Sequence, residues 1–317
     1  AADFARGGVS LLRAAGAQTL GFGSECGDAG LLAGQARRLD AVESSAPVRA
    51  FLKEGMSFPR AREAAWKALY GEEPAFAAPN DLLAVEYLRA ASALAPGMTF
   101  LAVGRAGCGH DGDAPSDGFA SASFLRSQID EPYRCAPYMP KEAFLAMSRL
   151  LLEDAAPARM EALERHILHV LRGMEASGFA RLPDVTEGLE NRLVRAARQA
   201  GSLAEFYALA KTKRYPLARL RRIACCAVLG IGREEKRRPP AYLRVLALNG
   251  RGAQILSAAK KRGAPPIGVN FADLYRLRPE GLELDLRAQE LFALAQPSVP
   301  PCGRDFTEQV KIQDCMG

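Results

Sequence analysis

The sequence lacks the features that mark membrane, secreted and disulfide-stabilised proteins. No stretch approaches the roughly 18 apolar residues expected of a membrane span, and residues 1–6 carry no basic segment leading into an apolar one. The seven cysteines are odd in number and show no Cys-x-x-Cys spacing, which argues against a disulfide framework and a zinc site. The adjacent Cys225 and Cys226 lie in an apolar segment and are most simply core residues. A reducing cytoplasm fits these absences.

Charge is spread unevenly along the chain. The 317 residues are enough for two domains, and their formal net charge is +6. Between Lys211 and Arg262, however, cations are dense and only Glu234 and Glu235 oppose them. Such a segment suits a polyanion. A solvated helix face is the alternative explanation.

Residues 3–15 are predicted to form a helix that leads into a strand over 19–23. Gly23 stands at the carboxyl end of that strand, where an α/β sheet presents its ligand side. A glycine there would let a ligand approach the backbone closely. A plain tight turn is the alternative.

A second helix and strand follow the polar, helical residues 28–72, within which Trp66 and Leu69 are expected to point inward. Apolar residues recur at helical spacing from Leu82, so the segment beginning at Asn80 is predicted to be a helix. Asn80 is expected to cap its first turn, and Asp81 to lie at the positive end of its dipole. A strand over 98–104 is predicted to follow. Arg105 comes directly after it, at the edge of the sheet where phosphates or bases of a ligand would bind. An exposed strand end is the alternative for Arg105.

The loop 105–120 and the helix start after it complete the first half of the chain. His110 and Asp111 in the loop resemble a metal or acid/base pair, although such a pair is more often a surface feature. Ser121 and Ser123 stand at a predicted helix start, whose free N–H groups and Arg126 would together bind an anion. An ordinary helix cap is the alternative.

The second half, from the proline-rich residues 137–140, is predicted to be mostly helical. His166 and His169 lie one turn apart and could ligate a metal, but no third ligand is apparent, so packing or surface roles are favoured. Residues 211–216 combine three cations with the ring of Tyr215. Single-stranded RNA is recognised by stacking and by backbone charge, which makes this segment the best candidate for binding an RNA loop.

Four segments in this order resemble the tRNA(Met) cytidine acetate ligase family of bacteria. They are Pro79-Asn80-Asp81, Glu187-Gly188-Leu189-Glu190-Asn191-Arg192, Lys211-Thr212-Lys213-Arg214-Tyr215-Pro216 and Tyr242-Leu243-Arg244-Val245-Leu246. The resemblance covers nearly the whole chain. It implies an α/β fold in which an incomplete Rossmann-type nucleotidyltransferase domain over 1–136 precedes a mainly helical, basic tRNA-binding domain over 137–317.

The resemblance also implies a function. The family uses ATP, with Mg²⁺, to convert acetate to acetyl-adenylate, and then acetylates N4 of the wobble cytidine of elongator tRNA(Met). By resemblance, Gly23, Asn80 and Arg105 would contact ATP, with Ser121, Ser123 and Arg126 near its phosphates. The tRNA would be held by Lys211, Lys213, Arg214, Arg219 and Arg222. No protein-bound metal, membrane or stable protein partner is expected, and the catalytic residues are not assigned.

One departure from the family pattern affects the expected activity. Family members begin with a β-α unit that carries a His-x-Gly-His motif for ATP, and no such motif occurs in the 317 residues. We therefore expect this chain to lack an N-terminal segment and to be inactive by itself. Two alternatives stay open: a nucleotidyltransferase acting on a small metabolite, and an RNA-binding protein without catalytic activity.

Overall fold

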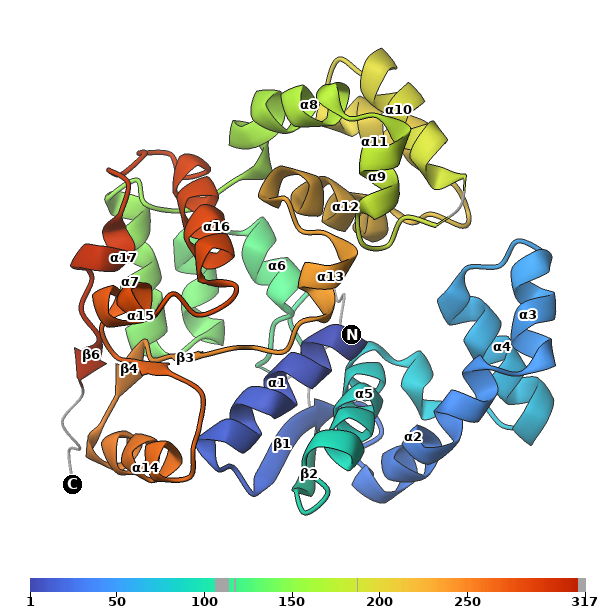
Figure 1. Cartoon of the computed structure of the whole chain (residues 1–317), viewed down its shortest axis with the longest axis horizontal. Coiled ribbons are helices and arrows are strands. Elements are labelled where there is room, and N and C mark those ends of the chain that lie inside the picture. Colours follow the sequence, from blue (N-terminus) through green and yellow to red (C-terminus); the bar gives the residue numbers. More distant parts are fainter. Residues whose placement is uncertain (106–113, 117, 187, 313–317) are drawn as a thin grey trace.

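The protein is a mixed α/β molecule in which many helices surround short parallel sheets (Figure 1). The computed structural model describes residues 1–105, 114–116, 118–186 and 188–312. Within these ranges no helix is both long and apolar enough to cross a membrane. The Rossmann-like first part and helical second part confirm the predicted fold class.

A two-stranded parallel sheet organises the first part of the chain. β1 (Thr19–Ser24) pairs with β2 (Thr99–Gly104) in a register that runs from Thr19 opposite Thr99 to Ser24 opposite Gly104. α1 (Ala2–Ala15) precedes β1. The connection between the strands contains α2 (Ala29–Glu43), α3 (Ala46–Lys53), α4 (Phe58–Tyr70), a short 3₁₀ helix (Ala75–Ala77) and α5 (Pro79–Leu94). The strands predicted over 19–23 and 98–104 are therefore confirmed.

One face of this sheet is buried against helices. Phe22 of β1 packs with Leu32 of α2 and Val85 of α5, all of them buried, while Leu101 on the opposite face of β2 is 58% exposed. The predicted inward position is confirmed for Trp66, which is fully buried, but is wrong for Leu69, which is 46% exposed. Leu69 lies three residues after Trp66 on α4. The core that buries Ala65 and Trp66 does not extend to Leu69.

A helical unit follows. Its members are α6 (Ala122–Ser127), α7 (Lys141–Leu152), α8 (Glu164–Gly173), α9 (Ala176–Arg181), α10 (Leu189–Gln199), α11 (Leu203–Ala210), α12 (Leu217–Leu229) and α13 (Arg233–Arg237), with 3₁₀ helices at Pro132–Tyr138 and Met160–Leu163. α8 to α12 share one core, in which Phe179, Phe206 and Ile223 are fully buried. This unit lies above α1 and the sheet in Figure 1.

The last part of the chain adds two short parallel pairings. β3 (Leu243–Arg244) pairs with β5 (Ile267–Gly268), and β4 (Ala247–Leu248) pairs with β6 (Lys311–Ile312). Between and after them lie α14 (Gly250–Lys261), α15 (Phe271–Leu277), α16 (Leu282–Leu294) and α17 (Arg304–Thr307).

The first and last parts of the chain are in contact. Arg262, just after α14, donates a hydrogen bond to the carbonyl of Ala15 at 3.2 Å. The boundary expected between residues 136 and 137 falls inside the 3₁₀ helix Pro132–Tyr138. The division into 1–136 and 137–317 stays a prediction.

Candidate functional site

The carboxyl ends of β1 and β2 form one edge of the sheet. The backbone N–H of Arg105 donates to the carbonyl of Ser24 at 3.0 Å, so the strand pairing extends one residue past β2. Gly23 is exposed at the same edge, and a Cβ added to it would meet no atom within 4 Å. The structure thus brings Gly23 and Arg105 together, beside open space.

A buried carboxylate fixes the turn after β1. Asp81, only 1% exposed, accepts hydrogen bonds from the Ser24 hydroxyl at 2.5 Å and from the N–H groups of Glu25 and Cys26 at 3.0 Å each. Because Asp81 lies in the first turn of α5, these bonds tie the end of β1 to the start of that helix. Gly27, with φ +68°, closes the turn.

Glu25 makes the reciprocal contact with α5. Its carboxylate accepts from the side-chain amide of Asn80 at 2.6 Å, from the N–H of Asp81 at 3.0 Å and from the N–H of Asn80 at 3.3 Å. Burial raises the pKa of Glu25, but these hydrogen bonds outweigh it and hold the pKa below its ordinary value. A carboxylate at a helix N-terminus is also favoured by the helix dipole.

The predicted cap of α5 by Asn80 is wrong. The helix begins at Pro79, one residue earlier, and its N-cap residue Ala78 has no capping side chain. Proline favours the first helical position, so Asn80 falls inside the first turn. Its side chain instead donates to Glu25, from the turn after β1. Asn80 therefore contacts the turn that directly follows β1.

The serine motif forms the start of α6. The hydroxyl of Ser121, which is buried, accepts from the N–H of Phe124 at 3.0 Å, so Ser121 makes the helix cap that was the alternative to an anion site. Arg126 donates to Ser123 at 3.3 Å and is exposed. Ser123 and Arg126 are therefore brought together on one short helix. Their expected role beside phosphates stays a prediction.

The other polar candidates have simpler outcomes. His110 and Asp111, like Glu187, lie outside the described residues. His166 and His169 are exposed on α8. The described part of the chain contains no group of three or more His, Cys, Asp or Glu side chains that could hold a metal ion.

The basic segment around α12 divides into exposed and engaged cations. Lys211, Lys213 and Arg214 are exposed before the helix. Arg192 of α10 fixes the backbone there, since its guanidinium donates to the carbonyls of Leu209 and Ala210 at 2.7 and 2.8 Å. The structure places these three cations together on a rigidly held turn.

Tyr215 does not offer the ring face expected of it. Its side chain is 8% exposed and belongs to the helical core. The guanidinium of Arg219 lies 5.2 Å from the ring centroid, and that of Arg214 lies 5.8 Å from it. The prediction of a base-stacking ring is wrong, because Tyr215 is closed in by the core on one side and by arginines on the other.

Arg219 and Arg222 both bind at Asp184. Arg219 donates through Nε to the Asp184 carbonyl at 2.7 Å, and Arg222 pairs with the Asp184 carboxylate at 3.2 Å. The second carboxylate oxygen pairs with Lys236 at 2.9 Å. Burial raises the pKa of Asp184, but Lys236 and Arg222 outweigh it and lower the pKa. Arg219 therefore supports the fold, whereas the Arg222 side chain, 61% exposed, is still available to a ligand.

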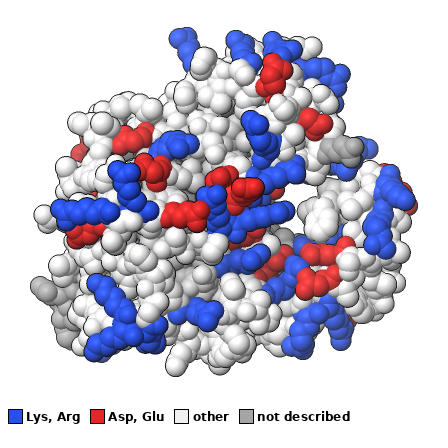
Figure 2. Space-filling view, viewed as in Figure 1, with Lys and Arg blue, Asp and Glu red and all other residues white. Residues whose placement is uncertain are grey.

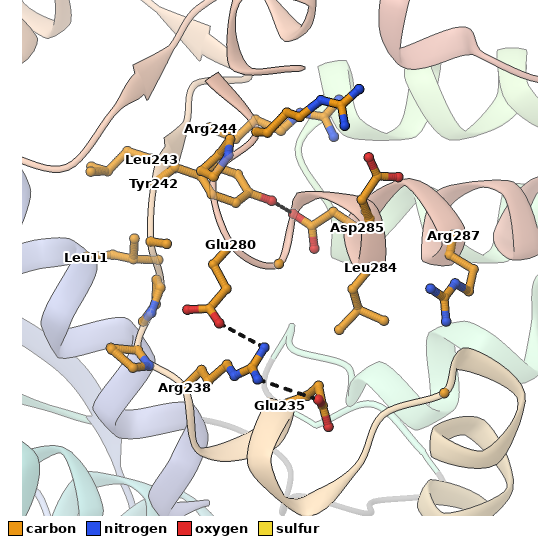
Figure 3. Close-up of a pocket in the computed structure, with 18 of the residues that line it drawn as sticks. Leu11, Glu235, Arg238, Tyr242, Leu243, Arg244, Glu280, Leu284, Asp285 and Arg287 are labelled. Carbon is orange, nitrogen blue, oxygen red and sulfur yellow. Dashed lines mark hydrogen bonds and ion pairs between the residues drawn. The ribbon is translucent and has the colours of Figure 1, made fainter. Parts of the chain in front are cut away.

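A large cavity lies elsewhere. It has a volume of about 950 Å³ and is enclosed by the second half of α1, residues 238–244 and the start of α16. Figure 3 shows Arg238 between Glu280, at 2.8 Å, and Glu235, at 3.8 Å. Across the cavity, the Tyr242 hydroxyl donates to Asp285. The cavity is at the opposite end of α1 from the carboxyl edge of β1, so it is not part of the site.

Sequence reasoning missed the residues that shape the site rather than line it. These are Ser24, Glu25 and Asp184. For Glu25 a signal existed, because it directly follows a strand end at the predicted ligand edge. For Asp184 no local pattern distinguishes the residue.

The parallel sheet with its open carboxyl edge is Rossmann-like, and comparison with known proteins gives the class of protein. A family model described as HIGH Nucleotidyl Transferase matches residues 1–304. A tRNA(Met) cytidine acetate ligase of Thermotoga petrophila is 31% identical over 340 residues, covering 97% of this chain and 81% of that protein. The chain therefore belongs to the HIGH nucleotidyltransferase family, among the tRNA(Met) cytidine acetate ligases.

Two solved structures agree with this assignment. The crystal structure of Thermotoga maritima TmcAL in its apo form matches with a TM-score of 0.87 at 29% identity, covering 98% of this chain and 81% of that one. The structure of the same protein bound with alpha-thio ATP matches with a TM-score of 0.84, covering 98% and 80%. The family suggested by the four sequence segments is confirmed.

Proposed function

We propose that the protein is an ATP-dependent acetate ligase of the cytoplasm that acetylates N4 of the wobble cytidine of elongator tRNA(Met). The observation that carries this proposal is the match along nearly the whole chain to a relative of that name. It is supported by the equally extensive match to a structure that binds an ATP analogue.

The reaction has two steps. An acetate oxygen attacks the α-phosphorus of ATP, which enters with Mg²⁺, and pyrophosphate leaves. The N4 amine of the cytidine then attacks the carbonyl carbon of acetyl-adenylate, loses a proton and releases AMP, giving N4-acetylcytidine. Adenylation turns a poor electrophile into a good one, so the protein contributes mainly positioning and charge stabilisation.

We assign ATP to the carboxyl edge of β1 and β2. Gly23 leaves space for close approach, Arg105 supplies positive charge, and Asn80 belongs to the bonded turn that holds the edge in shape. Ser123 and Arg126 are proposed to face the phosphates, on the short helix that Ser121 caps. On the tRNA side, Lys211, Lys213, Arg214 and Arg222 are proposed as direct contacts and Arg219 as their support. No partner protein enters this scheme.

The test is incorporation of labelled acetate into purified tRNA(Met), with the protein expressed from its full reading frame. Label is expected only when ATP is present. Incorporation into a transcript whose wobble cytidine is changed to uridine would contradict the proposed acceptor. Salt-sensitive tRNA binding without any ATP turnover would favour an RNA-binding protein instead.

A second assay tests the residues. Arg105→Ala is expected to weaken ATP binding about tenfold, because it removes a charge at the edge without disturbing the backbone bond to Ser24. Arg60→Ala, at an exposed arginine of α4, is the matched control and should leave ATP affinity unchanged. Equal ATP affinity of wild type and Arg105→Ala would remove Arg105 from the site.

A further inference from the structure

A cleft separates segments that are far apart in the sequence. The first turn of α1, residues 183–186 and α13 enclose a cavity of about 450 Å³, which Asp3, Arg233, Lys236 and Arg237 help to line. A smaller cavity of about 60 Å³ shares Asp3, Lys236 and Arg237 with it and extends along α1. We call the two together the α1–α13 cleft. Figure 1 shows α13 beside the N-terminal end of α1.

The cleft carries an excess of positive charge. Two carboxylates, Asp3 and Asp184, line it. Five cations face them: Arg6, Arg233, Lys236, Arg237 and Arg238. Figure 2 shows basic and acidic side chains interleaved across this part of the surface, so which cations are available depends on which of them are paired.

Both carboxylates are already neutralised. Lys236 pairs with Asp184 at 2.9 Å and with Asp3 at 3.3 Å, which joins α1 to residues 183–186. Arg6 and Arg237, in contrast, are exposed and form no ion pair among the described residues. Asp184 has a φ of +63°, an uncommon conformation for a residue with a side chain, and is held there by its cationic partners. Arg233 also forms no ion pair among the described residues, but its guanidinium is held by the carbonyls of Leu182 and Val185. Arg6 and Arg237 are therefore the cations of the cleft that are most available to a ligand.

The cleft continues the basic surface of α12. Arg222 of α12 shares Asp184 with Lys236 of α13, so the basic surface of α12 meets the cleft at Asp184. At its other end the cleft reaches the first turn of α1. Only residues 16–18 separate α1 from β1, so the two run in opposite directions, and α1 begins at the end of the sheet where β1 finishes. Cations of α12 and α13 thus meet at Asp184, and the cleft beside them reaches the end of α1 that lies at the open edge of the sheet.

We propose that the α1–α13 cleft binds the phosphodiester backbone of a single-stranded RNA loop, with Arg6 and Arg237 contacting phosphates. Lys236 is a positioning residue that holds the two walls of the cleft together. The inference rests on the proposed function, which supplies the RNA. It adds that the loop is guided along α13 rather than held only by the segment before α12.

The test compares Arg237→Ala with Arg60→Ala, the exposed arginine of α4, which lies apart from α13 in Figure 1. Equilibrium binding of tRNA(Met) is measured at several salt concentrations. Arg237→Ala is expected to weaken binding about fivefold at low salt and to reduce the slope of log affinity against log salt by about one, while Arg60→Ala changes neither. An unchanged slope in Arg237→Ala, or no tRNA binding by wild type, would overturn the proposal.

A separate readout keeps the two proposals apart. Acetate-dependent exchange of pyrophosphate into ATP needs no tRNA. If exchange and tRNA acetylation are present but Arg237→Ala binds tRNA as wild type does, only the cleft assignment fails. If exchange is absent while Arg237→Ala still lowers the salt slope, the proposed ligase activity fails and the cleft stands.

Lys236 needs its own test, because losing it could simply loosen the fold. Lys236→Met is expected to raise the KM for tRNA severalfold with the KM for ATP unchanged, and Lys236→Arg is expected to restore the tRNA KM. A Lys236→Met variant that melts earlier but keeps the wild-type KM for tRNA would show that the residue is only structural and would refute its positioning role.

Discussion

Replacing Asp81 tests whether its buried carboxylate holds the candidate ATP edge in shape. Asp81→Ala removes the acceptor of three hydrogen bonds and leaves the N–H groups of Glu25 and Cys26 without it. A hydrogen bond to a charged group contributes about 1.5–3 kcal/mol, and such bonds at one site are not additive. We therefore expect a loss of about 4 kcal/mol of unfolding free energy.

Asp81→Asn should fall between wild type and Asp81→Ala. The remaining amide oxygen can still accept from Ser24 and Glu25, but the new NH₂ group faces the N–H of Cys26, donor against donor. The expected loss is about 2 kcal/mol. Asp28→Ala is the control in the same unit. Asp28 is an exposed cap of α2, and removing it should cost only about 1 kcal/mol.

The assay is urea unfolding followed by tryptophan fluorescence. The single tryptophan, Trp66, is fully buried in the core that also holds α2 and α5, so its emission reports on this unit. The transition midpoint should shift in the order Asp81→Ala, Asp81→Asn, Asp28→Ala, with the m value unchanged. If both Asp81 variants unfold within about 0.5 kcal/mol of wild type, the carboxylate does not organise the turn and the argument is refuted.

Three further outcomes are expected. The lowered pKa of Glu25 means that its ionised form stabilises the fold above its unfolded pKa of about 4.3, and that this contribution is lost as pH falls through the folded pKa. Glu25→Gln should therefore flatten the dependence of stability on pH below about pH 5, measured by acid titration of Trp66 emission; an unchanged acid profile would contradict the role given to Glu25. Gly23→Leu should leave the free energy of unfolding nearly unchanged, because no atom lies within 4 Å of the added Cβ. It should weaken ATP binding at least tenfold, measured by calorimetry. Wild-type ATP affinity in this variant would exclude Gly23 from the site. Lys213→Ala should reduce the slope of log tRNA affinity against log salt by about one without lowering the melting temperature. Arg219→Ala should reduce tRNA affinity and also lower the melting temperature, since it removes the donor to the Asp184 carbonyl. The reverse pattern would exchange the roles assigned to the two residues.

Local patterns in the sequence determined the elements of the first part of the chain. Residues 98–104 include Thr99, Phe100 and Val103, which favour strands. The segment from Asn80 repeats apolar residues at helical spacing. A helix start was predicted at Ser121, and Ser121 caps α6. Gly23 and Arg105 were each placed at the carboxyl end of a strand from sequence, and the pairing of the two strands brings them to one edge.

Which polar side chains remain available was decided only by the tertiary structure. The Asn80 amide is engaged by Glu25, 55 residues away, and Arg219 is engaged by the Asp184 carbonyl, 35 residues away. The cations around Tyr215 in residues 211–216 predicted a ring available for stacking on a base, but the core of α8 to α12 buries that ring. The spacing of apolar residues along the sequence indicates only which local element a residue belongs to and which face of it is apolar. Whether a guanidinium or a ring meets a ligand depends on partners brought from elsewhere, and those are fixed only when the units pack.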